Sequence, residues 1–327
     1  MINAFRTYNP LNFLWLVLLL ILTRICYVFN APPKIEFVFF ESFARLLFPV
    51  AYEYALPPVV NILIASVFVL VQALLLNQLC SKFNLLGKPS LLPALMYITV
   101  SSLFTPFLTL SSPLICNFLL IAMLYRLFAL YKGTEAKSIA YDLGMIVAVG
   151  SLFYLPFIYF FLIIWIGLIT FKPFDWREWV AGALGYATIF FFLAVFYFLN
   201  DRIGQFYTIW LPLATKFPDK ININYYNYLL LVPVIVILAL CFIKLRENFY
   251  RSYVQTRKSY QLLAIVFMVA ALSFYVKAFQ LSHFLLCAVP GAVFFAYYFL
   301  YATKRWFYES LYILLVAGIV YFQFNTF

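Results

Sequence analysis

The sequence predicts an all-α protein, a polytopic transmembrane helix bundle of about eleven spans. Its composition carries the prediction, because 67% of the residues are hydrophobic, 22% are aromatic and only 10% are charged. A soluble domain is about half apolar and about a quarter charged, so a water-soluble fold could not cover this much apolar surface. This excludes soluble enzymes, nucleic-acid modules, fibrous chains and disordered chains. The solid apolar runs also differ from the alternating strands of an outer-membrane barrel.

The spans are predicted from apolar runs separated by short polar connections. A bilayer core takes about 20 helical residues, and each run must be helical because lipid offers the backbone no hydrogen-bond partner. Residues 139–171, divided by Pro156, are too long for one span and favour a tight helical hairpin over one kinked helix. The runs lie at about 11–30, 58–80, 91–107, 113–131, 139–155, 156–171, 179–199, 226–244, 261–276, 283–302 and 307–325.

The basic residues predict the orientation of this single transmembrane domain, 1–327. With the N-terminus in the cytoplasm, the inner segments hold 15 of the 22 Lys and Arg residues and the outer segments hold 6. Lys and Arg concentrate on the cytoplasmic side of membrane proteins, so this bias predicts a cytoplasmic N-terminus. The longest inner connection, 245–260, is predicted to be a basic cytoplasmic loop. The net charge of +11 therefore reflects topology and indicates no nucleic-acid partner.

The first outer loop, 31–57, combines charged and aromatic residues. Lys34, Glu41 and Arg45 recur at helical spacing among aromatic and leucine residues, which predicts an interfacial amphipathic helix. One interpretation is a helix lying on the membrane with a solvated Glu41–Arg45 pair. The other is that Glu36 or Glu41, with Arg45, meets a lipid head group.

Two further residues are candidates for binding. Arg24 lies within the first span, where a charge is costly and either functional or snorkelling to the interface. If it binds a ligand, its guanidinium fork suits an anionic phosphate at the outer leaflet. His283 opens the tenth predicted span and is either an interfacial hydrogen-bonding residue or a base.

Other polar residues favour structural roles. Asp175, followed three residues later by Glu178, is typical of a helix start. Asn61, Gln72 and Asn117 are expected to hold helices together. The five cysteines form no CxxC and no cluster, and with a single histidine the sequence predicts no metal site and identifies no cofactor.

The whole chain resembles an uncharacterised family of multi-spanning inner-membrane proteins of Bacteroidota. The resemblance is carried by Asn9-Pro-Leu-Asn-Phe, by Leu110-Ser-Ser-Pro followed by Asn117, and by the segment from Phe171 to Trp179, which reads Phe-Lys-Pro-Phe-Asp-Trp-Arg-Glu-Trp. It implies a location in the bacterial inner (cytoplasmic) membrane and little chemistry.

The layout also resembles the polyprenol-phosphate-dependent glycosyltransferases of the C superfold. The shared features are a first span, an outer loop with an acid, short paired spans, and a late element similar to His283-Phe-Leu-Leu-Cys-Ala-Val-Pro. By this resemblance Glu36 or Glu41 would be the catalytic base or bind a metal, and Arg24, Arg45 or His283 would hold phosphate. The chain departs from that pattern because no paired acid follows its first span and it has no outer soluble domain.

Three functional hypotheses follow. The first is the handling of lipid-linked sugars or envelope glycans at the outer leaflet, with membrane lipids and a polyprenyl-phosphate-linked substrate as partners. The second is a non-enzymatic subunit or scaffold that binds other envelope membrane proteins. The third is a transporter or lipid flippase, which requires a water-filled polar cavity.

Overall fold

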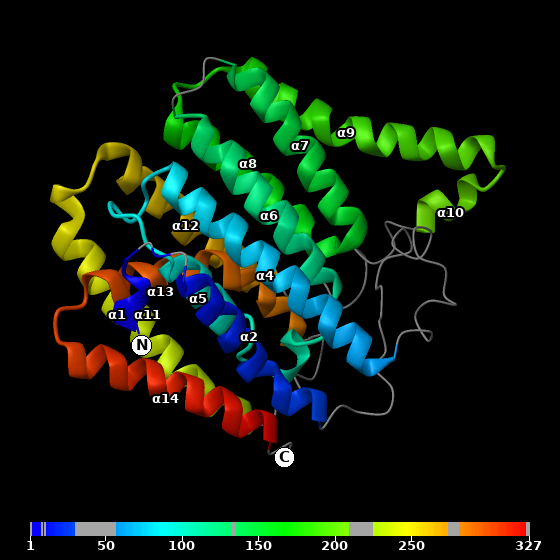
Figure 1. The fold of residues 1–327 in the computed structure, drawn as a ribbon. Helices are drawn as coiled ribbons and strands as arrows, with labels where there is room; N and C mark the ends of the chain where they lie inside the picture. The colour runs from blue at the N-terminus through cyan, green and yellow to red at the C-terminus, as the bar shows by residue number, and fades with distance from the viewer. Residues whose placement is uncertain are drawn as a thin grey trace.

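The computed structural model describes residues 2–7, 9, 11–29, 57–131, 135–208, 225–273 and 281–324. These residues form α- and 3₁₀-helices and no strand (Figure 1), which confirms the all-α prediction. All but the last residue of the predicted outer loop 31–57 lie outside the described residues. The elements are α1 Ile2–Phe5, α2 Leu11–Phe29, α4 Pro58–Lys82, α5 Leu92–Val100, η2 Thr105–Phe107, α6 Ser112–Ala129, α7 Ala136–Phe153, η3 Leu155–Tyr159, α8 Phe160–Phe171, α9 Trp176–Leu199, α10 Ile203–Thr208, α11 Tyr225–Asn248, η5 Phe249–Arg251, α12 Val254–Leu272, η7 Leu281–Cys287, α13 Ala288–Tyr301 and α14 Arg305–Phe324.

Eight helical stretches in the described part are long and apolar enough to cross a membrane. The chain is therefore an integral membrane protein, while the count of eleven spans is not confirmed. The predicted span 91–107 is broken, because α5 has nine residues and is followed by the separate 3₁₀-helix η2. At about 1.5 Å per residue, nine residues cover less than half of a core about 30 Å thick.

Proline residues mark several of the helix starts. A proline occupies the first or second position of α4, α5, η2, α6 and η3. Proline is tolerated there because the first N–H groups of a helix have no intrahelical partner. Pro156 accordingly opens η3, so that α7 and η3–α8 are two separate elements and not one kinked helix.

Two predictions about polar segments, the helix start at Asp175 and the loop at 245–260, can be compared with the structure. Asp175 is the N-cap of α9, and its side chain accepts a hydrogen bond from the backbone N–H of Arg177 at 3.0 Å, as the sequence predicts. The basic stretch 245–260 is mostly helical, because α11 continues to Asn248 and α12 begins at Val254. Basic side chains are compatible with helix, so both helices extend past their apolar runs.

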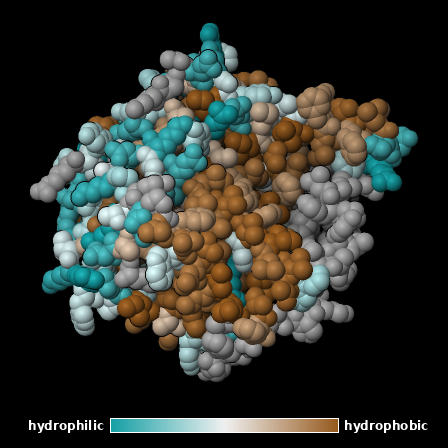
Figure 2. Space-filling view, in the orientation of Figure 1, coloured by the Kyte–Doolittle hydropathy of each residue, from teal (hydrophilic) through white to brown (hydrophobic). Residues whose placement is uncertain are grey.

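The short helix α5 lies at the centre of the bundle. It packs against α2, α4 and α13, and all nine of its residues are buried. Hydrophobic residues form a broad surface across the middle of the molecule, and hydrophilic residues gather at the left of Figure 2. This left-hand end holds the start of α1 and of α14 (Figure 1). A broad apolar surface beside a polar end fits a protein surrounded by lipid.

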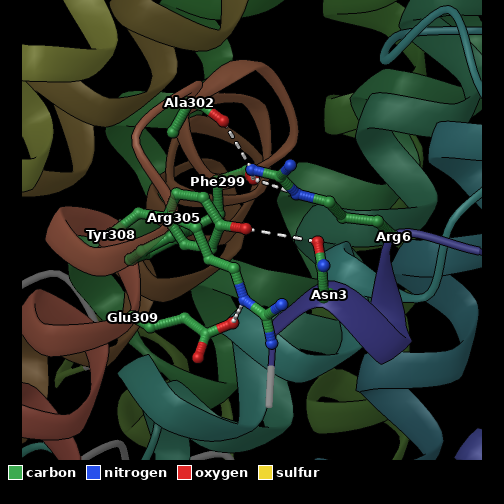
Figure 3. Close-up of polar contacts among 7 residues, drawn as sticks. All are labelled: Asn3, Arg6, Phe299, Ala302, Arg305, Tyr308 and Glu309. Carbon is green, nitrogen blue, oxygen red and sulfur yellow. Dashed lines mark hydrogen bonds and ion pairs between the residues drawn. The ribbon is translucent and has the colours of Figure 1, made fainter.

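The N-terminal segment is fixed to the late helices by Arg6 (Figure 3). Its Nε and Nη2 donate to the Phe299 carbonyl at 3.0 and 2.7 Å, and Nη2 also donates to the Ala302 carbonyl at 2.7 Å. The guanidinium lies 4.3 Å from the ring centroid of Tyr308, whose hydroxyl donates to Asn3 Oδ1 at 3.2 Å. Arg6 thus satisfies carbonyls at the end of α13 that have no intrahelical partner.

The helices α7 and α9 pack so closely that their backbones touch at glycines. A Cβ at Gly144 would lie 2.1 Å from the carbonyl oxygen of Gly182, and one at Gly185 would lie 2.1 Å from that of Tyr141. A Cβ at Gly182 would instead meet its nearest atoms at 3.5 Å, an ordinary contact. Small residues that let helices approach are typical of membrane interfaces.

Gly144→Ala should therefore destabilise the protein while Gly182→Ala does not. Alanine favours helix by about 1 kcal/mol over glycine, but overpacking costs about 1–3 kcal/mol, and at Gly144 the obstacle is backbone. We expect a lower melting temperature in detergent for Gly144→Ala and an unchanged or higher one for Gly182→Ala. Equal melting temperatures for the two variants would contradict this packing.

Candidate functional site

Arg24 is a buried cation near the end of α2. Only 3% of the residue is exposed. Its Nη1 donates to the hydroxyl of Ser66 on α4 at 3.2 Å and to the Leu108 carbonyl at 3.1 Å. Its Nε and Nη2 are buried and have no hydrogen-bond partner. One side of the guanidinium is thus engaged by protein and the other side is free.

The free side is the one that binds anions most strongly. Nε–H and Nη2–H point in parallel, and a carboxylate or phosphate accepts both hydrogen bonds at once. Arg6 uses the same two nitrogens, both on the Phe299 carbonyl (Figure 3). The ion pairs of the described residues join Arg126 to Asp142, Lys244 to Glu247 and Arg305 to Glu309. None of them includes Arg24.

The carbonyl that Arg24 contacts belongs to a non-helical connection inside the bundle. Between α5 and α6 the chain is interrupted at η2, which Pro106 opens. A proline has no N–H with which to continue the hydrogen bonds of an α-helix from α5, so the break has a local cause. Leu108 is fully buried, and the Leu110 N–H donates to Asn61 Oδ1 at 2.8 Å. Non-helical backbone at this depth requires such partners.

An apolar cavity of about 250 Å³ is lined in part by the same connection. Its walls come from the end of α5, η2, α11, α12, η7 and α13. No lining side chain is charged. The lining residues are Val100, Leu103, Phe104, Phe107, Leu231, Val234, Leu238, Phe267, Ala271, Leu281, Phe284, Cys287, Gly291 and Phe295.

A buried polar network crosses the bundle beside this connection. Gln72 donates to the Leu114 carbonyl at 2.7 Å and accepts from the Tyr97 hydroxyl at 2.7 Å. Asn117 donates to Tyr97 Oη at 3.1 Å and to the Leu285 carbonyl at 3.0 Å. The amides predicted to hold helices together therefore do so, by bonding backbone groups of other elements.

His283 is buried within a second network. Its Nε2 donates to the Ala270 carbonyl at 2.9 Å, which makes Nδ1 the acceptor of the Tyr154 hydroxyl at 2.7 Å. The Ser273 hydroxyl lies 3.2 Å from Nε2. Both ring nitrogens thus have protein partners, and a phosphate could bind this ring only if one of these bonds broke.

The predicted site residues are therefore only partly placed. Arg24 and His283 have no hydrogen-bond partner in common. Glu36, Glu41 and Arg45 lie outside the described residues, so their convergence with Arg24 stays a prediction. Within the described ranges no three His, Cys, Asp or Glu side chains gather in a group that could hold a metal ion.

Sequence reasoning missed the residues that surround Arg24. Ser66 and Leu108 carry no motif, and their contacts with Arg24 join segments that are distant in the sequence. The break at η2 had a usable signal, since Pro106 and Pro113 lie close together within the predicted runs. The lining of the cavity had none, because its residues have the composition of any apolar helix.

Comparison with known proteins gives a family. The model of a family of unknown function, DUF6427, matches residues 34–327. The chain belongs to this family. No curated protein and no solved structure matches the chain. The DUF6427 match includes the cavity and His283 and begins after Arg24.

Replacing Arg24 should not destabilise this DUF6427 protein. A buried charge without a counter-ion is unfavourable, and exchanging buried ionic groups for apolar ones of similar volume is often neutral or stabilising by about 1–4 kcal/mol. We expect Arg24→Met to keep or raise the melting temperature in lipid-free detergent, because removing the uncompensated charge offsets the lost hydrogen bond to the Leu108 carbonyl. Arg6→Met is the matched control and should lower the melting temperature, because the hydrogen bonds of Arg6 all go to backbone carbonyls. A marked fall in the melting temperature of Arg24→Met alone would show that Arg24 stabilises the fold, and would contradict this prediction.

Replacing His283 should destabilise the protein. His283→Phe preserves an aromatic ring and leaves the Ala270 carbonyl and the Tyr154 hydroxyl with one partner fewer. An unsatisfied buried polar group costs about 1–3 kcal/mol. The melting temperature of purified His283→Phe should fall, whereas that of Phe284→Leu, a neighbouring apolar change, should fall less. An unaltered melting temperature in His283→Phe would show that these bonds contribute little.

Proposed function

We propose that this protein binds the phosphate of a lipid-linked sugar or related envelope-glycan intermediate through Arg24. The supporting observation is the free Nε–Nη2 edge of a guanidinium that is 3% exposed. A buried cation without a counter-ion is rare in a membrane protein and is a functional-site hypothesis in itself. A phosphate oxygen pair would satisfy both donors and neutralise the charge.

The proposal includes a place and an orientation. With the N-terminus cytoplasmic in a bacterial inner membrane, the excess of inner Lys and Arg places Arg24 towards the outer leaflet. Arg24 lies 13 residues after the start of α2 at Leu11, which is about 20 Å along the helix axis. This depth is towards the outer boundary between hydrocarbon and head groups, near which the phosphate of a lipid carrier lies.

By the resemblance to the C superfold, the catalytic residue would lie in the outer loop. In that form of the proposal Glu36 or Glu41 is the general base, and Arg45 assists Arg24. The transporter hypothesis has less support, because the centre of the bundle around α5 is filled by buried side chains and the described cavity beside it is apolar.

Binding of a lipid phosphate should depend on Arg24. We expect undecaprenyl phosphate to bind the purified protein, and undecaprenol, which lacks the phosphate, to bind much more weakly. A hydrogen bond to a charged group contributes about 1.5–3 kcal/mol, so Arg24→Gln should weaken phosphate binding roughly 10- to 100-fold. Arg24→Lys should retain part of the affinity because it keeps the charge but not the fork.

The measurement is a lipid titration followed by thermal shift or intrinsic fluorescence. Arg305→Gln is the control, because Arg305 lies at the other end of the bundle and pairs with Glu309 at 3.1 Å. Its affinity should equal that of the wild type. The proposal is contradicted if Arg24→Gln binds undecaprenyl phosphate with the affinity of the wild type.

A further inference from the structure

The apolar cavity and the free edge of Arg24 are joined by one short stretch of chain. The Leu108 carbonyl accepts the hydrogen bond from Arg24, and Phe107, the preceding residue, lines the cavity. Consecutive Cα atoms lie about 3.8 Å apart. The cation and the cavity therefore contact consecutive residues of the segment that includes η2.

The pair of features suits an amphiphile. Arg24 offers two donors to one anionic group, and the cavity offers walls without charge, five of them phenyl rings. Its volume of about 250 Å³ exceeds the roughly 150 Å³ of an apolar cavity that binds benzene. That space takes a short stretch of one hydrocarbon chain, and it does not take the paired chains of a glycerolipid.

We propose that the cavity holds the head-proximal part of the single polyisoprenoid chain of a lipid monophosphate whose phosphate binds Arg24. This inference rests on the proposed function and adds the site of the chain. The broken connection at η2 then has two roles, since its backbone holds the arginine and its phenylalanines contact the hydrocarbon. The rest of the chain extends into the bilayer.

The cavity can be filled without disturbing the Arg24 side of the connection. Gly291 lines it from α13, and a Cβ at this position meets a single atom, Phe267 Cε2, at 3.8 Å. The backbone at Gly291 therefore tolerates a side chain, and Gly291→Leu places a branched one in the space. Ala271→Phe fills it from α12, so that one variant serves if the other fails to fold.

The experiment compares three ligands in lipid-free detergent, which are undecaprenyl phosphate, isopentenyl phosphate with one isoprene unit, and dioleoyl phosphatidate with two acyl chains. We expect Gly291→Leu and Ala271→Phe to weaken undecaprenyl phosphate at least tenfold and to leave the weak binding of isopentenyl phosphate unchanged. Gly182→Ala, on α9 and outside the cavity lining, should match the wild type. Arg24→Gln should weaken the binding of both undecaprenyl phosphate and isopentenyl phosphate.

Different failures have different meanings. If Arg24→Gln weakens binding and neither filled variant does, the chain lies elsewhere and the proposed function stands. If Arg24→Gln has no effect, the proposed function is wrong. If phosphatidate binds as tightly as undecaprenyl phosphate and is equally sensitive to Gly291→Leu, the single-chain assignment is overturned.

Cys287 supplies a measurement on the unmodified protein. It lines the cavity as a partly exposed free thiol, whereas Cys80, Cys116 and Cys241 are buried. Undecaprenyl phosphate should slow the alkylation of Cys287, followed by peptide mass spectrometry, several-fold more than isopentenyl phosphate does. Equal alkylation rates with and without the long-chain lipid would place the chain outside this cavity.

Discussion

Lipid cannot hydrogen-bond a peptide group, and the structure is organised around this constraint. Continuous helices meet it locally, but the chain is broken at η2 and changes to 3₁₀-helix at η7. At these places side chains replace the missing backbone partners. Asn61 accepts from the Leu110 N–H, and Asn117 donates to the Leu285 carbonyl. Amides with both a donor and an acceptor suit the task because they can join two elements at once.

The charged side chains inside the bundle follow the same rule at helix ends. Arg6 bonds the carbonyls that end α13, and the Lys258 ammonium donates to the Thr170 carbonyl near the end of α8 at 2.6 Å. Cations are favourable at helix C-termini, where the carbonyls carry partial negative charge. Arg24 departs from this pattern, because only Nη1 is used and the remaining edge is buried without a partner. That difference separates a structural arginine from one available to a ligand.

Packing in the bundle relies on small residues where helices touch and on bulky ones where they face lipid. The α7–α9 contact is closest at Gly144 and Gly185, and the outer side of α9 presents exposed Phe191, Phe192 and Phe196. The hydrophobic effect does not draw helices together in lipid, so close approach and interhelical hydrogen bonds hold the bundle. The side chains of α5 fill the centre of the bundle, and the apolar cavity lies beside η2.

The sequence by itself determined the class of the protein, its helical runs and several of their ends. Long apolar segments can only be helices in lipid, and the signals at Pro58, Pro113, Pro156 and Asp175 act within one turn of the chain. It also suggested Arg24, since a charge within an apolar run is visible without a structure. Only the tertiary structure decided that α5 stops after nine residues, that Asn117 reaches Leu285 and that Arg24 reaches Leu108. These contacts join residues 84 and 168 positions apart, and no local pattern encodes which distant backbone group a side chain will meet.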